Sequence, residues 1–390
     1  MRLLIEGGTL VTPEVVLPNH TLYIEDGRIA FLGVGSHSDD GEWFRVNAAG
    51  MWVVPGFIDI HVHGAAGYEV MDGTEEALYS MAKFFAQHGV TSYLATTISA
   101  DFDNTLAAVD NVSRTNQPSN GAQHLGIHLE GPYLNPKYGG AQPPRQIRNP
   151  NLKEFESWLS SGAVRMVTLA PEIPGSLPII DRGIRDGIQF AVGHSMASYE
   201  QLQVAIGRGL HHATHTFNGM QAMNHRDPGV VGGVLTDDRI WAQLICDGVH
   251  VHPAIVKLLF SAKGVKRTIL ITDAIGATGL KDGIYSQLGQ SIIVSQGIAR
   301  TNEGRLAGST LTLDTALRNM ISYCDLSLAQ ALPMVTSVPA EAMGIASRKG
   351  SLHPGLDADI VLLDSKLNVR LSIIAGRVVY QAKDYNNSHN

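Results

Sequence analysis

Two histidines, His61 and His63, end the apolar stretch "VVPGFIDIHVHG" at residues 53–64. Side chains on a strand alternate between its two faces, so these imidazoles are expected to point to the same face. Two imidazoles on one face of an apolar strand are costly unless something binds them. Neutral imidazole is the commonest nitrogen ligand of divalent metals, so the pair indicates a metal site. Two hydrogen-bonded core histidines would explain an isolated pair equally well.

Four more residues with metal-ligand or acid–base chemistry follow apolar stretches of the same kind. A carboxylate buried at a strand end without a partner is expensive, which favours a ligand role for the glutamate of "HLEG". In "HHATH", His211 and His215 are expected on one strand face, and His215 lies nearer the strand end. We therefore expect His211, like His128, to pack beside or beneath the site. The four predicted residues are Glu130, His194, His215 and Asp273.

Eight short apolar stretches recur through the middle of the chain and must position these residues. Continuous apolar runs of this length suit strands buried on both faces. Helical patterns lie between most of them, as in "SYEQLQVAIGRG", where Ser198 and Gln201 form a capping box. Eight βα units predict a (β/α)8 TIM barrel of the α/β class; the alternative, a doubly wound open sheet, lacks a dinucleotide fingerprint. The stretches are residues 56–64, 91–97, 124–131, 164–172, 188–195, 210–218, 240–248 and 267–274.

Both ends of the chain have hairpin-like patterns instead. The N-terminal part contains "TLYIEDGRIAFLG", where Asp26 and Gly27 predict a tight turn, and the C-terminal part contains "VRLSIIAGRVVYQ". Neither end has enough strands to bury its own face, so we expect them to pack together. An irregular insert with a hairpin is expected at residues 275–308. The expected domains are a small β-sandwich, residues 1–52 plus 350–390, and a catalytic barrel, residues 53–349.

The predicted strand ends bring the chemical residues together. In TIM barrels the active site is built at the carboxyl ends of several strands, and all six residues fall at such ends. We therefore predict a metal site there. Position alone leaves open whether Asp273 is a ligand, a base or both, and His194 by itself could be structural. Cys246 and Cys324 lack the spacing of zinc ligands.

Composition excludes several classes of function. The net charge is −7 without a basic run, which argues against nucleic acid as a partner. The sequence contains no run of about 18 apolar residues, so no membrane span is expected. The N-terminal segment also lacks the pattern of a signal peptide. The two cysteines form no disulfide framework, in agreement with a cytoplasmic location. An anionic small substrate would need a local basic pocket.

Several motifs resemble those of one family. They are "HLEGPYLNPKYGGAQP", "GHS", "HTFNGM", "RDPGVVG", "DGVHVHP", "TDA" and "LAGSTLTLD". With the two histidines after the first strand, they make residues 53–314 similar to the N-acetylglucosamine-6-phosphate deacetylases of the amidohydrolase superfamily. "HLEGPYLN" and "RDPG" are specific to the deacetylases, whereas "TDA" is shared across the superfamily. The resemblance implies a distorted TIM barrel with a small β-sandwich from both chain ends.

The resemblance also implies a mechanism. The family counterparts of Glu130, His194 and His215 hold a divalent metal, usually Zn2+, with Fe2+, Mn2+ or Co2+ as alternatives. The two histidines after the first strand allow a second ion, so one or two metals per subunit are expected. The counterpart of Asp273 takes a proton from water and returns it to the departing amine. The products would be glucosamine 6-phosphate and acetate.

The resemblance further implies a binding site for an amino-sugar phosphate. Exposed N–H groups at Asn218 and Gly219 could meet the phosphate, and Arg226 offers a planar fork for its oxygens, although a surface salt bridge with Asp227 is the alternative. In the family this arginine can come from the neighbouring subunit, which implies a homodimer with the phosphate site near the interface. The other expected substrate contacts are Ala141, Gln142, Asp247, His250, Leu306, Ala307 and Gly308.

Two departures from the family pattern leave the substrate open. Many members carry histidine at Gln142, where it polarises the acetyl carbonyl, and many read "FNAMPP" where this chain reads "FNGMQAMN". A galacto-configured or unphosphorylated N-acetylhexosamine is therefore an alternative substrate. Cyclic amidases are a rival class, but they usually place a carboxylated lysine at the fourth strand, which here ends "TLAPE". A non-catalytic scaffold is the other rival, and scaffolds typically lose their ligands.

Overall fold

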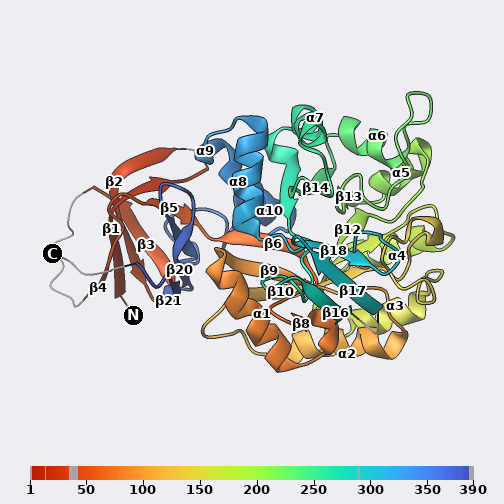
Figure 1. Ribbon diagram of the computed structural model, residues 1–390, viewed down its shortest axis with the longest axis horizontal. Coiled ribbons are helices and arrows are strands. Elements are labelled where there is room, and N and C mark those ends of the chain that lie inside the picture. Colours follow the sequence, from red (N-terminus) through yellow and green to blue (C-terminus); the bar gives the residue numbers. More distant parts are fainter. Residues whose placement is uncertain (1, 14, 35–42, 288–289, 386–390) are drawn as a thin grey trace.

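The computed structural model describes residues 2–13, 15–34, 43–287 and 290–385, and its strands form two large sheets that lie side by side along the molecule (Figure 1). One sheet is the predicted barrel, with eight parallel strands; six lie inside their predicted stretches, and β9 and β10 each begin one residue before theirs. Their side chains are almost entirely buried, as expected for strands covered on both faces. The barrel strands are β6 Phe57–Val62, β9 Val90–Thr96, β10 Gln123–Glu130, β11 Val164–Leu169, β12 Gln189–Val192, β13 Leu210–Ala213, β14 Trp241–Ile245 and β15 Thr268–Ile271.

The barrel nearly closes between its first and last strands. Neighbours pair in the order β6, β9, β10 and onward to β15. Beyond the end of β15, Asp273 donates its N–H to the carbonyl of His61 across 3.0 Å, and His63 donates to the carbonyl of Ala274 across 2.8 Å. These bonds fix the two predicted histidines beside the aspartate at the carboxyl end of the barrel.

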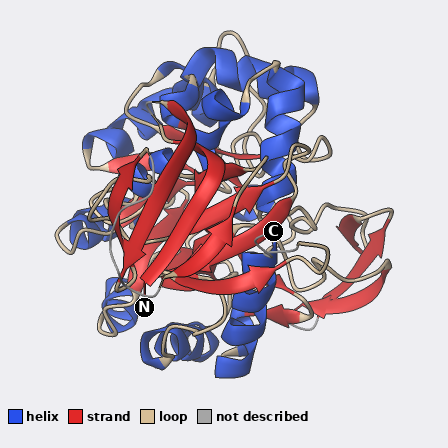
Figure 2. Cartoon of the chain, turned by 90° about the vertical axis from the view of Figure 1, so that its left-hand side faces the viewer, coloured by secondary structure: helices blue, strands red, loops and turns tan. Residues whose placement is uncertain are grey.

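Helices surround the barrel, and Figure 2 shows them behind and around the strands of the second sheet. Local sequence sets their boundaries: α5 begins at the predicted capping box of Ser198 and Gln201, and Asp101 caps α2. The α-helices are α1 Glu75–Gln87, α2 Phe102–Arg114, α3 Leu152–Leu159, α4 Ser176–Ile184, α5 Tyr199–Gly207, α6 Gly229–Thr236, α7 Pro253–Lys263, α8 Leu313–Cys324, α9 Leu328–Ala331 and α10 Ser337–Ala342. Short 3-10 helices are η1 Val70–Asp72, η2 Pro136–Tyr138, η3 Val265–Arg267 and η4 Leu332–Val335.

The second sheet combines both ends of the chain, as predicted. It is mainly antiparallel, and the turn at Asp26 and Gly27 has the positive φ angles, 48° and 80°, of a tight hairpin. The sheet surrounds an apolar core of its own. The two chain ends are joined there by backbone hydrogen bonds: Ala358 donates its N–H to the carbonyl of Gly27, and Gly376 donates its N–H to the carbonyl of Ala358. Its strands are β1 Arg2–Val11, β2 Val16–Glu25, β3 Arg28–Gly33, β4 Phe44–Asn47, β5 Trp52–Pro55, β19 Ile360–Leu363, β20 Val369–Ile374 and β21 Arg377–Gln381.

The expected insert leaves the barrel after β15. It forms a three-stranded antiparallel sheet with a small apolar cluster of its own, and it lies against the barrel in Figure 1. Within the described residues, no helix has both the length and the apolar character needed to cross a membrane. The strands of the insert are β16 Gly283–Gln287, β17 Gln290–Ser295 and β18 Ile298–Thr301, and a short pair, β7 Gly64–Ala65 and β8 Tyr68–Glu69, follows β6.

Candidate metal centre and active site

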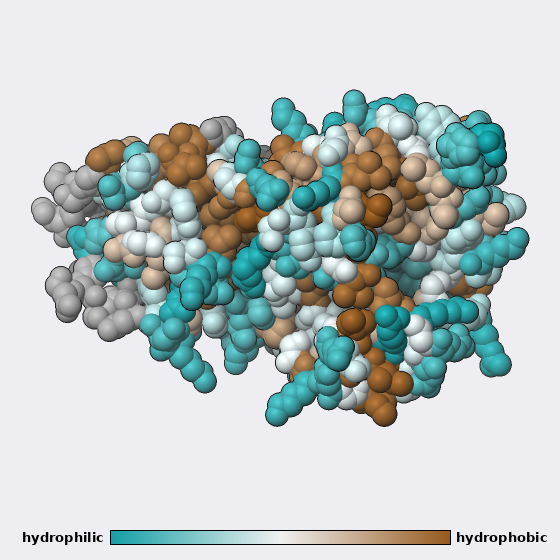
Figure 3. Space-filling view, turned by 45° about the horizontal axis from the view of Figure 1, so that its top comes forward, coloured by the Kyte–Doolittle hydropathy of each residue, from teal (hydrophilic) through white to brown (hydrophobic). Residues whose placement is uncertain are grey.

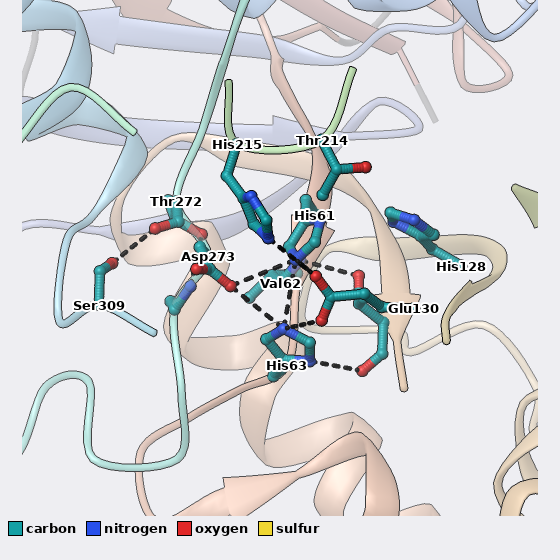
Figure 4. Close-up of polar contacts among 12 residues, drawn as sticks. His61, Val62, His63, His128, Glu130, Thr214, His215, Thr272, Asp273 and Ser309 are labelled. Carbon is teal, nitrogen blue, oxygen red and sulfur yellow. Dashed lines mark hydrogen bonds and ion pairs between the residues drawn. The ribbon is translucent and has the colours of Figure 1, made fainter. Parts of the chain in front are cut away.

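The six predicted residues converge at the carboxyl end of the barrel. Figure 4 labels five of them: His61, His63, Glu130, His215 and Asp273. Glu130 is the last residue of β10, whereas His194, His215 and Asp273 each lie two residues beyond a strand. These three have left-handed backbones, with φ of 48°, 31° and 53°. The backbone therefore turns inward just after each strand ends. Left-handed residues other than glycine are uncommon and concentrate at functional sites.

One group of ligands forms around one oxygen of Glu130. Its Oε1 lies 3.2 Å from Nε2 of His194 and 3.0 Å from Nε2 of His215, and the two Nε2 atoms are 3.2 Å apart. All three side chains are buried. A carboxylate and two imidazoles with converging donor atoms match the ligand types that zinc and related divalent metals prefer.

A second group forms beside the first. Nε2 of His61 and Nε2 of His63 are 3.2 Å apart, and they lie 3.2 Å and 3.1 Å from Oδ1 of Asp273 (Figure 4). The strand prediction that these two histidines share a face is confirmed. Glu130 lies between the groups, because its Oε2 is 3.4 Å from Nε2 of His63. The geometry therefore offers two adjacent ligand sets with one carboxylate between them.

The second ring nitrogen, Nδ1, shows that three of these histidines are oriented to bind a metal through Nε2. Nδ1 of His63 lies 3.2 Å from the carbonyl of Thr96, and Nδ1 of His194 lies 2.8 Å from that of Tyr138. Nδ1 of His215 likewise lies 3.2 Å from a backbone carbonyl. A carbonyl only accepts, so Nδ1 of each ring carries a proton, and Nε2 is the ring atom that can bind a metal. This arrangement fixes histidine orientation in metal sites.

Burial and pairing set the charge of the two carboxylates. Burial raises the pKa of Glu130, but the surrounding histidines outweigh burial and hold this pKa well below its ordinary value. Burial also raises the pKa of Asp273, and the hydrogen bonds to His61 and His63 outweigh it, so this pKa too is strongly lowered. Burial lowers the pKa of His63, yet the two carboxylates raise it well above the usual range. Two buried anions need a compensating proton or cation.

Asp59 supports this arrangement from beneath. It is buried in β6, and its carboxylate accepts hydrogen bonds from the Thr272 hydroxyl at 2.6 Å and from the His61 N–H at 3.2 Å. Burial raises the pKa of Asp59 to about 7, although these hydrogen bonds lower it. Asp59 thereby connects the first strand to the residue immediately before Asp273.

His128 lies beside the site, as predicted, but His211 does not. Nδ1 of His128 lies 3.1 Å from the carbonyl of Ile60, and its ring is 4.9 Å from that of His61. The prediction for His211 is wrong, because β13 ends at Ala213 and the alternation of side chains ends with it. His211 is half-buried near Arg239 and Arg267, not near the ligands.

Gln142 has an orientation that the sequence did not indicate. Its Nε2 donates to Oε2 of Glu130 across 2.5 Å, and its Oε1 accepts from the N–H of Ser99 across 2.7 Å. The side chain is buried and held at both ends. Gln142 therefore contacts a predicted metal ligand directly.

A cavity of about 260 Å³ opens above the ligands. Most predicted substrate contacts line it, whereas Arg226, Asp247 and Ala307 are not among its lining residues. Arg226 is exposed, with its guanidinium 2.9 Å from Nε2 of His225. Asp247 lies behind the wall, with its Oδ2 2.6 Å from Nδ1 of His250. The predicted residues that line the cavity are His63, Glu130, Ala141, Gln142, His194, His215, Asn218, Gly219, His250, Asp273, Leu306 and Gly308.

Four further residues line the cavity and were not predicted: Ile98, Gly140, Ile275 and Arg305. Each is a close sequence neighbour of a predicted strand end or motif residue. Ile98 follows the second barrel strand, and Arg305 precedes the "LAG" motif. Ile98 and Ile275 would have been found if candidate residues had been taken one or two positions beyond the predicted strand ends as well. Arg305 carries no pattern of its own.

Comparisons with known proteins agree with this geometry. Residues 52–384 match the Amidohydrolase family, so the chain belongs to that family. It is 39% identical to the N-acetylgalactosamine-6-phosphate deacetylase of Escherichia coli O157:H7, over 95% of this chain and 97% of the relative. It is 36% identical to the N-acetylglucosamine-6-phosphate deacetylase of Lysinibacillus sphaericus, over 93% of this chain and 94% of the relative.

A solved structure shows the same likeness in three dimensions. It is a mutant of N-acetyl-D-glucosamine-6-phosphate deacetylase from Mycobacterium smegmatis in complex with N-acetyl-D-glucosamine-6-phosphate. It matches with a TM-score of 0.89 and 33% identity, over 97% of this chain and 100% of that one. The predicted resemblance to amidohydrolase deacetylases is therefore confirmed.

Proposed function

We propose that this chain removes the acetyl group of N-acetylglucosamine 6-phosphate, giving glucosamine 6-phosphate and acetate, in amino-sugar catabolism. The observation that carries the proposal is the position of Glu130 between two histidine groups, with Asp273 beside them at the floor of a cavity. Acid–base groups beside a metal-ligand set are what hydrolysis of an unreactive amide needs. The names and the close similarity of the relatives support the substrate class.

The proposed cofactor is Zn2+, with Fe2+, Mn2+ or Co2+ as alternatives. Glu130, His194 and His215 would hold one ion, and His61 and His63 would help to hold a second. A bound divalent metal acts as a Lewis acid that makes water a strong nucleophile near neutral pH. The nitrogen and oxygen donors fit all four metals, so the donor set by itself does not choose between them.

Asp273 is the proposed proton carrier. Burial raises its pKa, but its histidine partners outweigh burial and lower this pKa well below the usual range, so the carboxylate is ionised at neutral pH. It would take the proton from the attacking water at a carboxylate oxygen and deliver it to the amine nitrogen as the C–N bond breaks. Its short distances to His61 and His63 hold the carboxylate in place for both transfers.

The sugar phosphate is proposed to bind along the cavity wall, with its phosphate near Asn218, Gly219 and His250. Burial lowers the pKa of His250, but its hydrogen bond with Asp247 outweighs burial and raises this pKa above its ordinary value. The imidazole of His250 is therefore protonated more readily than a free one, and its positive charge would suit a phosphate. Ala141 and the turn at residues 306–308 would contact the sugar.

A homodimer is proposed because Arg226 does not reach the cavity of its own chain. In a dimer, Arg226 of one subunit would bind the phosphate in the cavity of the other. Large apolar side chains are exposed in the segment that carries Arg226 and in the segments that follow it, including Met223, Val249 and Leu258, and they would suit an interface. Figure 3 brings the α6–α7 side forward and shows apolar patches on the barrel half among hydrophilic side chains.

N-acetylgalactosamine 6-phosphate is the second candidate substrate. The E. coli relative with that name is 39% identical to this chain, and gluco and galacto sugars differ only in the orientation of one hydroxyl group. The departure "FNGMQAMN" borders Asn218 and Gly219 and supports keeping this candidate. A cyclic amidase fits less well, because no lysine is among the described residues that line the cavity.

An amine-release assay over acetylated hexosamines tests the proposal. N-acetylglucosamine and N-acetylgalactosamine would be compared, each with and without a 6-phosphate, in zinc-loaded protein. We expect the phosphorylated gluco sugar to have the highest kcat/KM. A preference for the galacto sugar would select the second candidate. Activity on cyclic amides alone, or on none of these substrates, would contradict the proposal.

We further propose that residues 53–349 form the catalytic domain and that residues 1–52 plus 350–390 form a supporting domain. The ligands and all cavity-lining residues lie in the first range. Part of the second, residues 1, 14, 35–42 and 386–390, lies outside the described residues. A cytoplasmic location is also proposed, in agreement with the free thiols of Cys246 and Cys324.

A further inference from the structure

The cavity contains one permanent cation that the proposed function does not use. Among the described residues that line it, Arg305 is the only lysine or arginine, whereas Glu130 and Asp273 supply negative charge at its floor. A dianionic ligand in such a cavity needs a cation within reach. Arg226 cannot serve from the same chain, because it lies outside the lining.

The backbone around Arg305 is held firmly at the cavity rim. Its carbonyl accepts from the N–H of Thr301 across 2.8 Å, which closes the turn after β18. Two residues later, Ala307 donates its N–H to the carbonyl of Ala299 across 3.1 Å. The side chain itself is more than half exposed, so only its base is fixed. Arg305 can therefore adjust to a ligand without a change in the backbone.

The guanidinium of Arg305 reaches across the rim to the loop after β10. Its Nη1 donates to the carbonyl of Gly140 across 3.2 Å, and its Nε lies 3.5 Å from Oε2 of Glu303. Within the part of the chain that the structure describes, its Nη2 has no hydrogen bond. A guanidinium has five N–H donors in a planar fork, so donors remain for a ligand.

The contact with Gly140 places Arg305 near the proposed phosphate position. A Cβ at Gly140 would lie 3.4 Å from Cε1 of His194, and one at Gly219 would lie 2.7 Å from its Nδ1. Gly140 and Gly219 therefore pack against the same imidazole ring. Arg305, bound to Gly140, faces the part of the cavity that Gly219 also lines.

We propose that Arg305 is a specificity-determining residue that binds the anionic group of the substrate from within the same chain. On binding, its fork would exchange the neutral carbonyl of Gly140 for phosphate oxygens. Charge-assisted bonds of this kind are about twice as strong as neutral ones. The inference rests on the proposed function, since it assigns a further contact to the same sugar phosphate. The competing explanation is a structural latch between the insert and the loop after β10.

The test compares three variants with the wild type: Arg305→Ala, Arg305→Lys and Arg300→Ala. Arg300 is the matched control, because it lies on β18 of the same insert and its Nη1 donates to Gly304 at 2.9 Å. Arg300 is not among the cavity-lining residues. Removing it changes the charge of the insert without removing the proposed contact. Each protein is assayed with N-acetylglucosamine 6-phosphate and with N-acetylglucosamine.

We expect Arg305→Ala to lower kcat/KM for the phosphorylated sugar by about 10- to 100-fold, the loss expected for a charged hydrogen bond. The loss should fall mainly on KM, and Arg305→Lys should recover part of it. Activity on the unphosphorylated sugar should change by less than about threefold, as should both activities of Arg300→Ala. Equal losses on both sugars would show the latch role and overturn the inference. So would equal effects of the two alanine variants, or no effect of Arg305→Ala.

Calorimetric titration with glucosamine 6-phosphate and with glucosamine separates this inference from the proposed function. If the wild type binds the phosphate and Arg305→Ala weakens that binding, the inference holds even when no acetyl group is released. If the wild type releases acetate from the sugar phosphate but Arg305→Ala binds and reacts normally, only the inference fails. If the wild type neither binds the phosphate nor hydrolyses its acetylated form, both fail.

Discussion

Gln142 donates a hydrogen bond from Nε2 to Oε2 of Glu130 across 2.5 Å, and the N–H of Ser99 holds its other end. The amide of Gln142 is therefore directed at the central carboxylate. Many relatives with histidine at this position are expected to use it on the acetyl carbonyl. Here the side chain is in position to orient Glu130 for metal binding.

Gln142→Ala is expected to weaken metal binding by about 10- to 100-fold, the usual effect of losing a residue that orients a ligand. The measurement is competition for zinc against a chelator of known affinity. Gln142→Glu is the control for side-chain shape. It keeps the size of the side chain but replaces the hydrogen-bond donor with a second carboxylate, which brings like charges together beside Glu130. Unchanged zinc affinity in Gln142→Ala would show that Glu130 is oriented by its histidines alone.

Metal removal is expected to abolish amide hydrolysis, and Zn2+ or another divalent ion should restore it. The reason is that Oε1 of Glu130 and the Nε2 atoms of His194 and His215 converge as a set of metal-ligand atoms. Metal analysis beside the activity assay would also give the number of ions per chain. Full turnover by protein verified to be metal-free would refute this prediction.

Asp273→Asn is expected to lower kcat by at least the about 100-fold typical of general acid–base groups. Asparagine keeps the shape of the side chain but cannot accept the proton from water. Metal content should be largely retained at Glu130, His194 and His215, and metal analysis of the variant checks this. Near-normal kcat with normal metal content would assign the proton transfers to another group.

Arg226→Ala is expected to lower kcat/KM for the 6-phosphate by about one to two orders of magnitude, with little effect on the unphosphorylated sugar. If Arg226 acts in the partner's cavity, mixing this variant with inactive Asp273→Asn should restore activity. In a mixed dimer, one cavity has an intact Asp273 and receives an intact Arg226. Failure to complement in verified mixed dimers would place Arg226 outside the site.

Preference for the phosphorylated sugar is expected to fall as the pH rises through the pKa of His250, which lies above the ordinary histidine value of about 6.5. Burial lowers the pKa of His250, but the hydrogen bond with Asp247 outweighs burial and raises this pKa, so the imidazolium persists to higher pH than in a free histidine and is lost as pH passes through the raised value. Any contribution of the His250–Asp247 pair to the free energy of unfolding has the same sign. It is complete below the pKa that His250 has in the unfolded chain, and it is lost as the pH rises through the raised pKa in the folded protein. The ratio of the two kcat/KM values against pH measures this, and His250→Gln should make it flat.

Local patterns in the sequence were enough to predict the barrel and its ligands. The eight apolar stretches are each long enough for a doubly buried strand, and strand ends in a barrel must meet at one face. For that reason Glu130 and Asp273 could be assigned to one site although they are far apart in the chain. The capping box at Ser198 and the turn at Asp26 were predictable because their chemistry is confined to a few neighbouring residues.

Only the tertiary structure decided how the loops complete the site. Gln142 points to Glu130 because the N–H of Ser99, from another βα unit, fixes its far end. Arg305 enters the cavity because the insert folds back over the barrel, and its contact with Gly140 joins segments 165 residues apart. The backbone also turns at His215, after a strand that ends at Ala213, five residues before the end of the predicted stretch at residue 218. Such orientations depend on long-range contacts, which leave no periodic signal in the sequence.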